Sequence, residues 1–163
     1  DTLNDIKALF NNAKNLQATI EKSINENSEL KKEVESFRQQ KVEELKNKLV
    51  AAAKDENGVK VVTNVLPIPA NSAKDLVFKI REAIPEHLVC VIGSIANDKP
   101  MLSVMFSEDM VKEHNLNAGK IIREAAKLIK GGGGGQPHYA QAGGKDKDGL
   151  TAAIEKVVEL CQL

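Results

Sequence analysis

Residues 131–144 read GGGGGQPHYAQAGG, and no other part of the chain is so distinctive. The stretch holds seven of the eleven glycines, a composition that in isolation is typical of a flexible linker. A linker joins domains, but only residues 145–163 follow, and they predict one amphipathic helix, 150–160, which needs a core to pack on. We therefore expect a structured loop. Its backbone N–H groups can approach an anion closely, although the Gly-Lys-Ser/Thr of a P-loop is missing.

The residues before the glycines predict a helix that begins at the N-cap Asn117 and ends at Ile129. Four basic residues share one face of this helix, because they follow one another at steps of three and four: Lys120, Arg123, Lys127 and Lys130. A solvated face would have the same pattern, and late lysines also favour the helix dipole. A basic stripe that leads into a glycine loop nevertheless suits a phosphodiester backbone.

The overall charge of the chain conceals this basic segment. Across all 163 residues 23 Lys and Arg balance 23 Asp and Glu, whereas residues 117–147 hold six positive and two negative side chains. Aromatic residues make up 3% of the chain, which argues against a surface of rings that stack on successive bases. We expect nucleic-acid binding that is modest and local.

Upstream of the basic helix, the pattern of apolar residues predicts a β-α-β-β unit. The strands are expected at 59–66, 87–96 and 101–107, and the helix at 73–84 with Ser72 as its N-cap. The turn at 97–100 predicts that the last two strands form an antiparallel hairpin. Residues 58–163 are therefore expected to form a small globular α/β (α+β) subdomain: a mixed β-sheet flanked by helices, with the Gly-rich loop.

Residues 1–57 contain no glycine and no proline, and they predict a short helix at 2–12 and a long one at 15–54. The apolar residues of the long helix form a narrow stripe typical of a coiled coil, with a break in the repeat between Phe37 and Val42. The stripe consists of Leu16, Ile20, Ile24, Leu30, Val34, Phe37, Val42, Leu45 and Leu49. We expect a helical coiled-coil subdomain, a long-helix hairpin, which could dimerise the protein.

Metal ligands and catalytic groups show no recognisable spacing. His87, His114 and His138 are scattered, and Cys90 and Cys161 make no disulfide framework, so we expect no metal site, no catalytic residue and a reducing, cytoplasmic location. No apolar run reaches the length of a membrane span. Because the first residue is Asp1 and not Met, we expect a fragment of a longer protein.

The stretch 131–144 resembles the C-terminal signature of bacterial-type alanyl-tRNA synthetases, in which a glycine run precedes a basic residue, Pro, two variable residues and AQAGG. The order of the predicted elements also resembles the C-terminal appendage of these enzymes. The resemblance implies a module that binds the outer corner of tRNA(Ala) and aids aminoacylation and editing. It implies the catalytic and editing domains of a parent ATP-dependent alanine–tRNA ligase as partners. It also implies no cofactor here, since ATP, Mg and Zn would serve the other domains.

The resemblance and the basic stripe together select the candidate tRNA-binding residues: Lys120, Arg123, Lys127, Lys130, Gly131, Gly132, Gly133, Gly134, Gly135, Gln136, Tyr139, Gln141, Gly143, Gly144 and Lys145. Gln136 stands where the family commonly has Arg or Lys, and so one charge is lost from the loop. Tyr139 has two open interpretations, a ring that stacks on an exposed base or a half-buried strand residue. His138 is expected to be exposed or to make a local hydrogen bond.

The globular part also resembles the substrate-binding domain of Asp-His-His phosphoesterases, whose comparable loop runs Gly-Gly-His-Pro and then Ala-Ala-Gly. Here Gln136 replaces that histidine, and no Asp-His-His motif occurs. A glutamine can hydrogen-bond a phosphate but cannot carry a proton as imidazole does. The sequence thus leaves three functions open: a tRNA-binding appendage, the substrate-binding domain of a phosphoesterase, and a coiled-coil dimerisation module.

Overall fold

The computed structural model describes residues 1–163, which form two compact units, Asp1–Lys41 and Val42–Leu163. Helix α2, Leu16–Ala51, runs through the division, and so its residues 42–51 belong to the second unit. Residue 57, where the sequence suggests a boundary, lies in a hairpin turn of the second unit. None of the helices combines the length and the apolar character that a membrane span requires.

The first unit contains α1, Thr2–Leu9, and the first part of α2. The carboxylate of Asp1 caps α1 by accepting the N–H of Asn4 at 3.0 Å, and the side chain of Asn15 accepts the N–H of Ala18 in the first turn of α2. The apolar stripe is exposed at Ile24, Leu30, Val34 and Phe37. The predicted long N-terminal helix is confirmed, whereas the pairing of its stripe in a coiled-coil hairpin stays a prediction.

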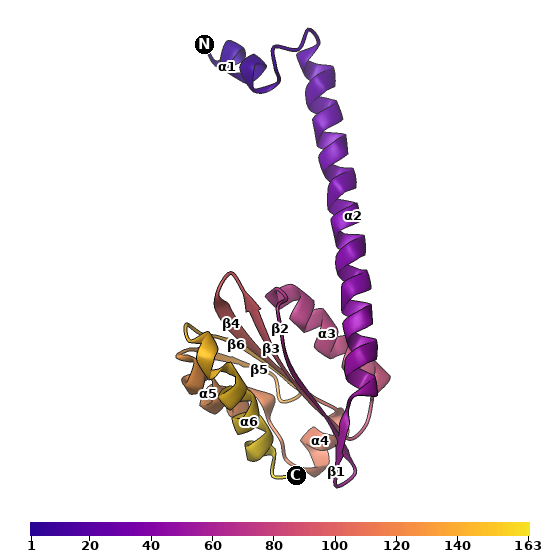
Figure 1. Ribbon diagram of the computed structural model, residues 1–163, viewed down its shortest axis with the longest axis vertical. Coiled ribbons are helices and arrows are strands. Elements are labelled where there is room, and N and C mark those ends of the chain that lie inside the picture. The colour runs from indigo at the N-terminus through magenta and orange to yellow at the C-terminus, as the bar shows by residue number, and fades with distance from the viewer. The chain divides into compact units, whose positions relative to one another are not determined.

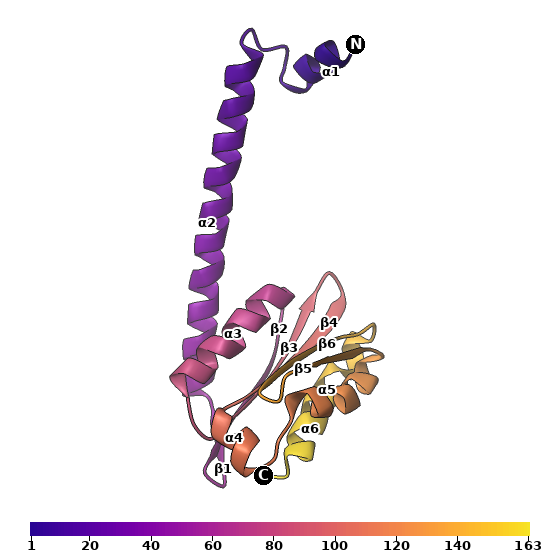
Figure 2. The ribbon, with the colours of Figure 1, turned by 180° about the vertical axis from the view of Figure 1, so that it is seen from behind.

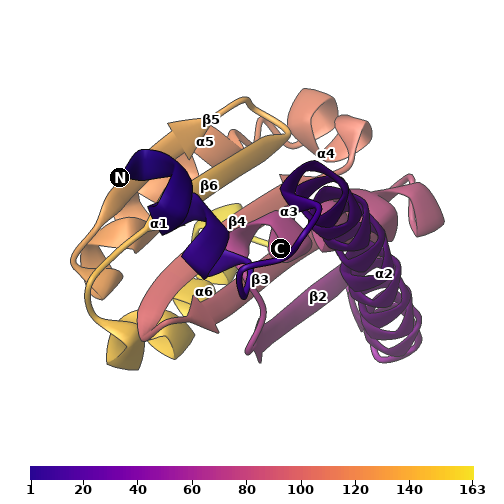
Figure 3. The same cartoon turned by 90° about the horizontal axis from the view of Figure 1, so that it is seen from above.

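The second unit is built on a six-stranded sheet in the order β1-β2-β3-β4-β6-β5, which Figure 3 shows from β2 to β5. Its strands are β1 (Lys54–Glu56), β2 (Val59–Leu66), β3 (Leu88–Ala96), β4 (Lys99–Phe106), β5 (Gly132–Gly135) and β6 (Tyr139–Gly143). Only β2 and β3 pair in parallel, and the other neighbours are antiparallel. The predicted mixed sheet and the hairpin of β3 and β4 are confirmed.

Helices cover both faces of the sheet (Figures 1 and 2). One face packs against α3, Ala70–Ala83, and against the end of α2, where Val42 and Leu49 are buried. The other packs against α4 (Glu108–Glu113), α5 (Ala118–Ala125) and α6 (Leu150–Cys161). Because strand β3 lies between the two layers, its residues 88–94 are all buried, as the unbroken apolar run predicts.

Two local predictions for the second unit are wrong. Ser72 is not an N-cap: α3 begins at Ala70, directly after Pro69, and Ser72 is a buried residue of the first turn. Strand β1 lies where the sequence predicts the end of the long helix. It pairs with β2 through a tight turn in which Asn57 and Gly58 have positive φ, and the Asp55 carboxylate accepts the N–H of Gly58 at 2.9 Å.

The predicted glycine loop is a pair of strands. Residues 132–135 form β5 and residues 139–143 form β6, joined by a turn in which the N–H of Gln136 donates to the carbonyl of Tyr139 at 2.7 Å. Strand β6 lies between β4 and β5, and so the glycines form one edge of the sheet. The preceding helix is also shorter than predicted, because it tightens into a 3₁₀ turn over Ala126–Ile129.

Asp109 joins the start of α4 to the start of β3. Its carboxylate accepts the backbone N–H of His87 at 3.0 Å and lies 3.0 Å from the Nδ1 atom of the same residue. Burial raises the pKa of Asp109, but hydrogen bonds from Ser107 and His87, together with the nearby His87 ring, outweigh burial and hold the pKa below its ordinary value of 3.8.

A depressed carboxyl pKa stabilises the fold at pH values above the unfolded pKa, and this stabilisation is lost as the pH falls through the folded pKa. We expect Asp109→Asn to lower the free energy of unfolding by about 1–2 kcal/mol at pH 7, and by progressively less below about pH 4. Urea unfolding of both proteins across this pH range measures the difference. The exposed Asp148→Asn is the control; equal pH dependence for wild type and Asp109→Asn would refute the role of Asp109.

Candidate nucleic-acid interface

The basic face of α5 follows from how this helix packs. The side chain of Asn117 accepts the N–H of Lys120 at 3.1 Å and starts the helix, as the sequence predicts. Ile122 and Ala125 are fully buried against the sheet. Lys120 and Arg123 therefore lie on the opposite, exposed side. Lys127 is exposed as well, but its Nζ lies 3.1 Å from the carboxylate of Glu124, which offsets part of its charge.

Lys130 ends the 3₁₀ turn in a left-handed conformation, with φ of 52°. Its N–H donates to the carbonyl of Lys127, and the N–H of Gly131 reaches back to the carbonyl of Ala126 at 3.0 Å. These two bonds form a Schellman motif, which satisfies the last carbonyls of the turn. The motif also turns the chain directly into strand β5, with the exposed Lys130 at its beginning.

At alternate positions of the glycine run, the backbone of the neighbouring strand β6 lies so close that a side chain would not fit. A Cβ atom at Gly131 would overlap the carbonyl oxygen of Gly143, and one at Gly133 would overlap that of Gln141 and lie 2.5 Å from the Cα atom of Ala142. At Gly132, by contrast, a Cβ would have no neighbour within 4 Å. The glycines are thus explained in part by close strand packing. The anion-binding loop expected from the sequence is instead an edge strand, one side of which has no strand partner.

A pocket of about 410 Å³ lies at the start of this strand. Its lining consists of Lys99, Pro100, Met101, Lys130, Gly131, Gly143, Gly144 and Lys145. Three lysines and no acidic residue belong to the lining. The glycines have no side chains that would cover the backbone, so that a phosphate can approach it. The nearby Asp98 is engaged elsewhere, since its carboxylate lies 3.0 Å from the Nζ of Lys147.

The structure brings together some of the predicted residues. Five of them line the glycine pocket: Lys130, Gly131, Gly143, Gly144 and Lys145. Arg123 lies beside the same strand, because a Cβ atom at Gly134 would be 3.5 Å from its Nη2. The exposed Lys120 follows one helical turn earlier, and Gln136 is exposed where β5 enters the turn to β6. The helix and the edge strand thus present one continuous set of basic and glycine residues.

Tyr139 and Gln141 do not join this set. The ring of Tyr139 packs against Phe78 of α3, with ring centroids 5.0 Å apart and planes tilted by 55°. Its hydroxyl is buried without a hydrogen-bond partner, and burial raises the pKa of Tyr139. Tyr139 is therefore the half-buried strand residue that the sequence allows. The Nε2 atom of Gln141, two residues further along β6, is also buried and unpaired.

Lys99, Pro100 and Met101 belong to the pocket but cannot be found from the sequence pattern. They begin strand β4, far from the glycines along the chain. Met101 pairs with Gly143 because β6 lies next to β4 in the sheet. This pairing brings Lys99 and Lys145 to the same end of the two strands. Only the strand order could have indicated it.

No group of three His, Cys, Asp or Glu side chains in residues 1–163 is arranged to hold a metal ion. The two thiols lie in the core, and burial raises the pKa of both, that of Cys161 to about 12. Neither cysteine is therefore a thiolate at neutral pH, the form needed for nucleophilic attack or metal binding.

Comparison with known proteins places this geometry in a family. The model of the DHHA1 domain matches residues 58–163. The alanine–tRNA ligase of Bacteroides fragilis is 51% identical over 160 residues, which are 98% of this chain but only 18% of that protein.

Two solved structures share the fold. The C-Ala domain of alanyl-tRNA synthetase from Aquifex aeolicus superposes with a TM-score of 0.60 and 26% identity, over 68% of this chain and 98% of that domain. RecJ from Thermus thermophilus, solved with Mg²⁺, has a TM-score of 0.51 and 17% identity over 90% of this chain and 20% of RecJ, which shows a common fold alone. The resemblance to the C-terminal domain of alanyl-tRNA synthetases is thereby confirmed, and the chain belongs to the DHHA1 domain family.

Proposed function

We propose that this chain is the tRNA-binding C-terminal appendage of an alanyl-tRNA synthetase. The observation that supports the proposal best is the glycine pocket, whose lining combines Lys99, Lys130 and Lys145 with the backbone of three glycines. Lysine side chains and accessible backbone are the groups that hold phosphodiesters in RNA complexes. The identity to the B. fragilis alanine–tRNA ligase supports the choice of tRNA(Ala) as the nucleic acid.

The pocket and α5 would bind different phosphates of the same RNA strand. One backbone phosphate enters the pocket, and the next phosphates along the strand meet Arg123 and Lys120 beside β5. Such contacts fix the position of an RNA without reading its sequence. We therefore propose that the chain recognises the shape of the outer corner of tRNA and binds it with modest affinity, since few cations take part.

The partners of the chain follow from this role. The appendage helps to hold the tRNA on which the catalytic and editing domains of the parent enzyme act. Those domains, with their ATP, Mg and Zn, carry out aminoacylation and editing. The exposed stripe of α2, at Ile24, Leu30, Val34 and Phe37, would support a homodimer through a coiled coil.

Simultaneous replacement of Lys120 and Arg123 by alanine tests the contribution of α5. We expect the affinity for tRNA(Ala) to fall about tenfold at 0.1 M salt, because two cations that face the phosphate backbone are lost. The plot of log affinity against log salt should also become less steep. Filter binding or fluorescence anisotropy over a salt series measures both quantities.

The matched control is the pair Lys48→Ala and Lys74→Ala, which removes the same charge from exposed positions of α2 and α3 on the other side of the sheet. Equal losses in the two double variants would mean that net charge alone matters and that α5 is not an interface. Turnover of a single-stranded oligonucleotide with Mn²⁺ would favour the phosphoesterase function instead.

A further inference from the structure

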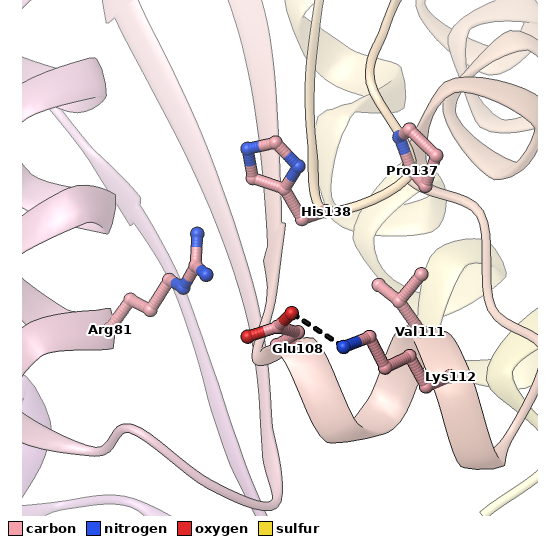
Figure 4. A pocket seen from close by; sticks show the side chains of 6 residues that line it. All are labelled: Arg81, Glu108, Val111, Lys112, Pro137 and His138. Carbon is pink, nitrogen blue, oxygen red and sulfur yellow. Dashed lines mark ion pairs between the residues drawn. The ribbon is translucent and has the colours of Figure 1, made fainter.

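A second pocket lies away from the glycine pocket, at the turn between β5 and β6. Its volume is about 390 Å³, and its lining consists of Arg81, Glu108, Val111, Lys112, Pro137 and His138. These residues come from three places in the sequence: the end of α3, helix α4 and the turn of the glycine hairpin. Figure 4 shows the ring of His138 and the guanidinium group of Arg81 directed toward the space beside Glu108.

Hydrogen bonds hold the turn that contributes His138. The carbonyl of Pro137 accepts the N–H of Ala118, at the start of α5, at 2.8 Å. The N–H of Gln136 donates to the carbonyl of Tyr139 and closes the hairpin on the other side. His138 therefore projects from a fixed backbone, and its place in the pocket does not depend on a mobile loop.

The charges of the pocket are mixed. Glu108 pairs with Lys112 at 2.8 Å, and this hydrogen bond lowers the pKa of Glu108. The carboxylate is therefore ionised at neutral pH and can only accept hydrogen bonds. Arg81 adds a guanidinium group, which matches a phosphate in shape and charge. Val111 and Pro137 supply apolar surface against which a flat ring can pack.

A nucleotide combines the three features that this lining complements: a flat ring, hydrogen-bond donors and a phosphate. Among the bases, guanine presents two adjacent donors, N1–H and the N2 amino group, on its Watson–Crick edge. Both can donate to the two oxygens of one carboxylate, whereas the same edge of adenine or cytosine offers a single donor group next to acceptors. A carboxylate thus attracts guanine and repels the acceptors of the other bases.

We propose that this pocket binds an unstacked guanine nucleotide of the bound RNA, with the guanine edge on Glu108 and the phosphate on Arg81. Lys112 pairs with the Glu108 carboxylate from the other side, and His138 packs against the base. The inference rests on the proposed tRNA-binding function, to which it adds one site that reads a base. RNA modules commonly bind unpaired bases in this way, through the Watson–Crick edge and stacking.

Titration of the 163-residue chain with GMP, AMP and guanosine tests the pocket directly. NMR signals of the His138 ring report on it. We expect GMP to shift these signals and to bind about tenfold more tightly than AMP, as is usual for a two-bond base contact. Glu108→Gln should abolish the preference for GMP over AMP, while Glu113→Gln, an exposed change on the same helix, should retain it.

Arg81 is tested through the phosphate. Arg81→Ala should remove the advantage of GMP over guanosine, and Lys74→Ala, at an exposed position of the same helix, should keep it. The inference is overturned if GMP leaves the His138 signals unchanged at millimolar concentration, or if GMP and AMP bind equally. Wild-type tRNA binding, measured in parallel, decides the proposed function separately: intact tRNA binding without a GMP preference refutes only the pocket.

Discussion

Gly131→Ala is expected to lower the free energy of unfolding by about 3 kcal/mol, whereas the neighbouring Gly132→Ala leaves it nearly unchanged or slightly higher. The added methyl group at Gly131 would overlap the carbonyl oxygen of Gly143 and lie 2.5 Å from the Cα atom of Gly144. Both contacts are with backbone, which cannot rotate away, and so β5 must separate from β6. At Gly132 the methyl group meets open space.

Urea unfolding followed by circular dichroism measures both variants. The two substitutions change the same atoms at adjacent positions, and each is therefore the control for the other. Equal stability of the two variants would mean that β5 does not pack against β6 as the register requires. Gly133→Ala should behave like Gly131→Ala, because its methyl group would also lie against the backbone of β6.

Replacement of all three lysines of the glycine pocket, Lys99, Lys130 and Lys145, by alanine is expected to weaken tRNA binding about a hundredfold at 0.1 M salt. These three lysines are the only charged residues that line the pocket, and so their loss removes its positive charge entirely. The salt dependence of binding should fall accordingly, since fewer ions are released. The side chains are at the surface, and the fold should therefore stay intact.

The control for this variant removes three exposed lysines elsewhere in the same unit, Lys48, Lys54 and Lys74. It has the same net charge, and it should bind tRNA nearly as well as the wild type. Anisotropy titrations of the two triple variants, each checked by circular dichroism, provide the comparison. A pocket variant that retained wild-type affinity would exclude the pocket as a phosphate site.

Local patterns were sufficient to predict most elements of the fold. The β-branched run of β2, the unbroken apolar run of β3 and the N-cap Asn117 each act within a few residues, and each element lies close to where the sequence suggests. The break in the apolar repeat between Phe37 and Val42 falls close to the division of the two units. Beyond it, Val42 and Leu49 enter the core of the second unit.

Features that depend on strand order could not be predicted in this way. A strand of glycines has no alternation of polar and apolar side chains, and so β5 looks like a loop. The approach of Lys99 to Lys145 depends on β6 lying next to β4, which no short segment encodes. The pocket beside His138 could not be predicted for the same reason, since Arg81 and Lys112 reach it only through the fold.

The glycine composition of β5 has a thermodynamic consequence. Glycine loses more backbone freedom on folding than any other residue, and four in succession bury no side chain in return. We expect β5 to be among the first parts of the sheet to open locally. RNA bound along β5 would keep the strand paired with β6. The entropic cost of ordering the strand would then reduce the free energy of RNA binding. The affinity for RNA would then decrease with rising temperature more steeply than the electrostatic contacts alone require.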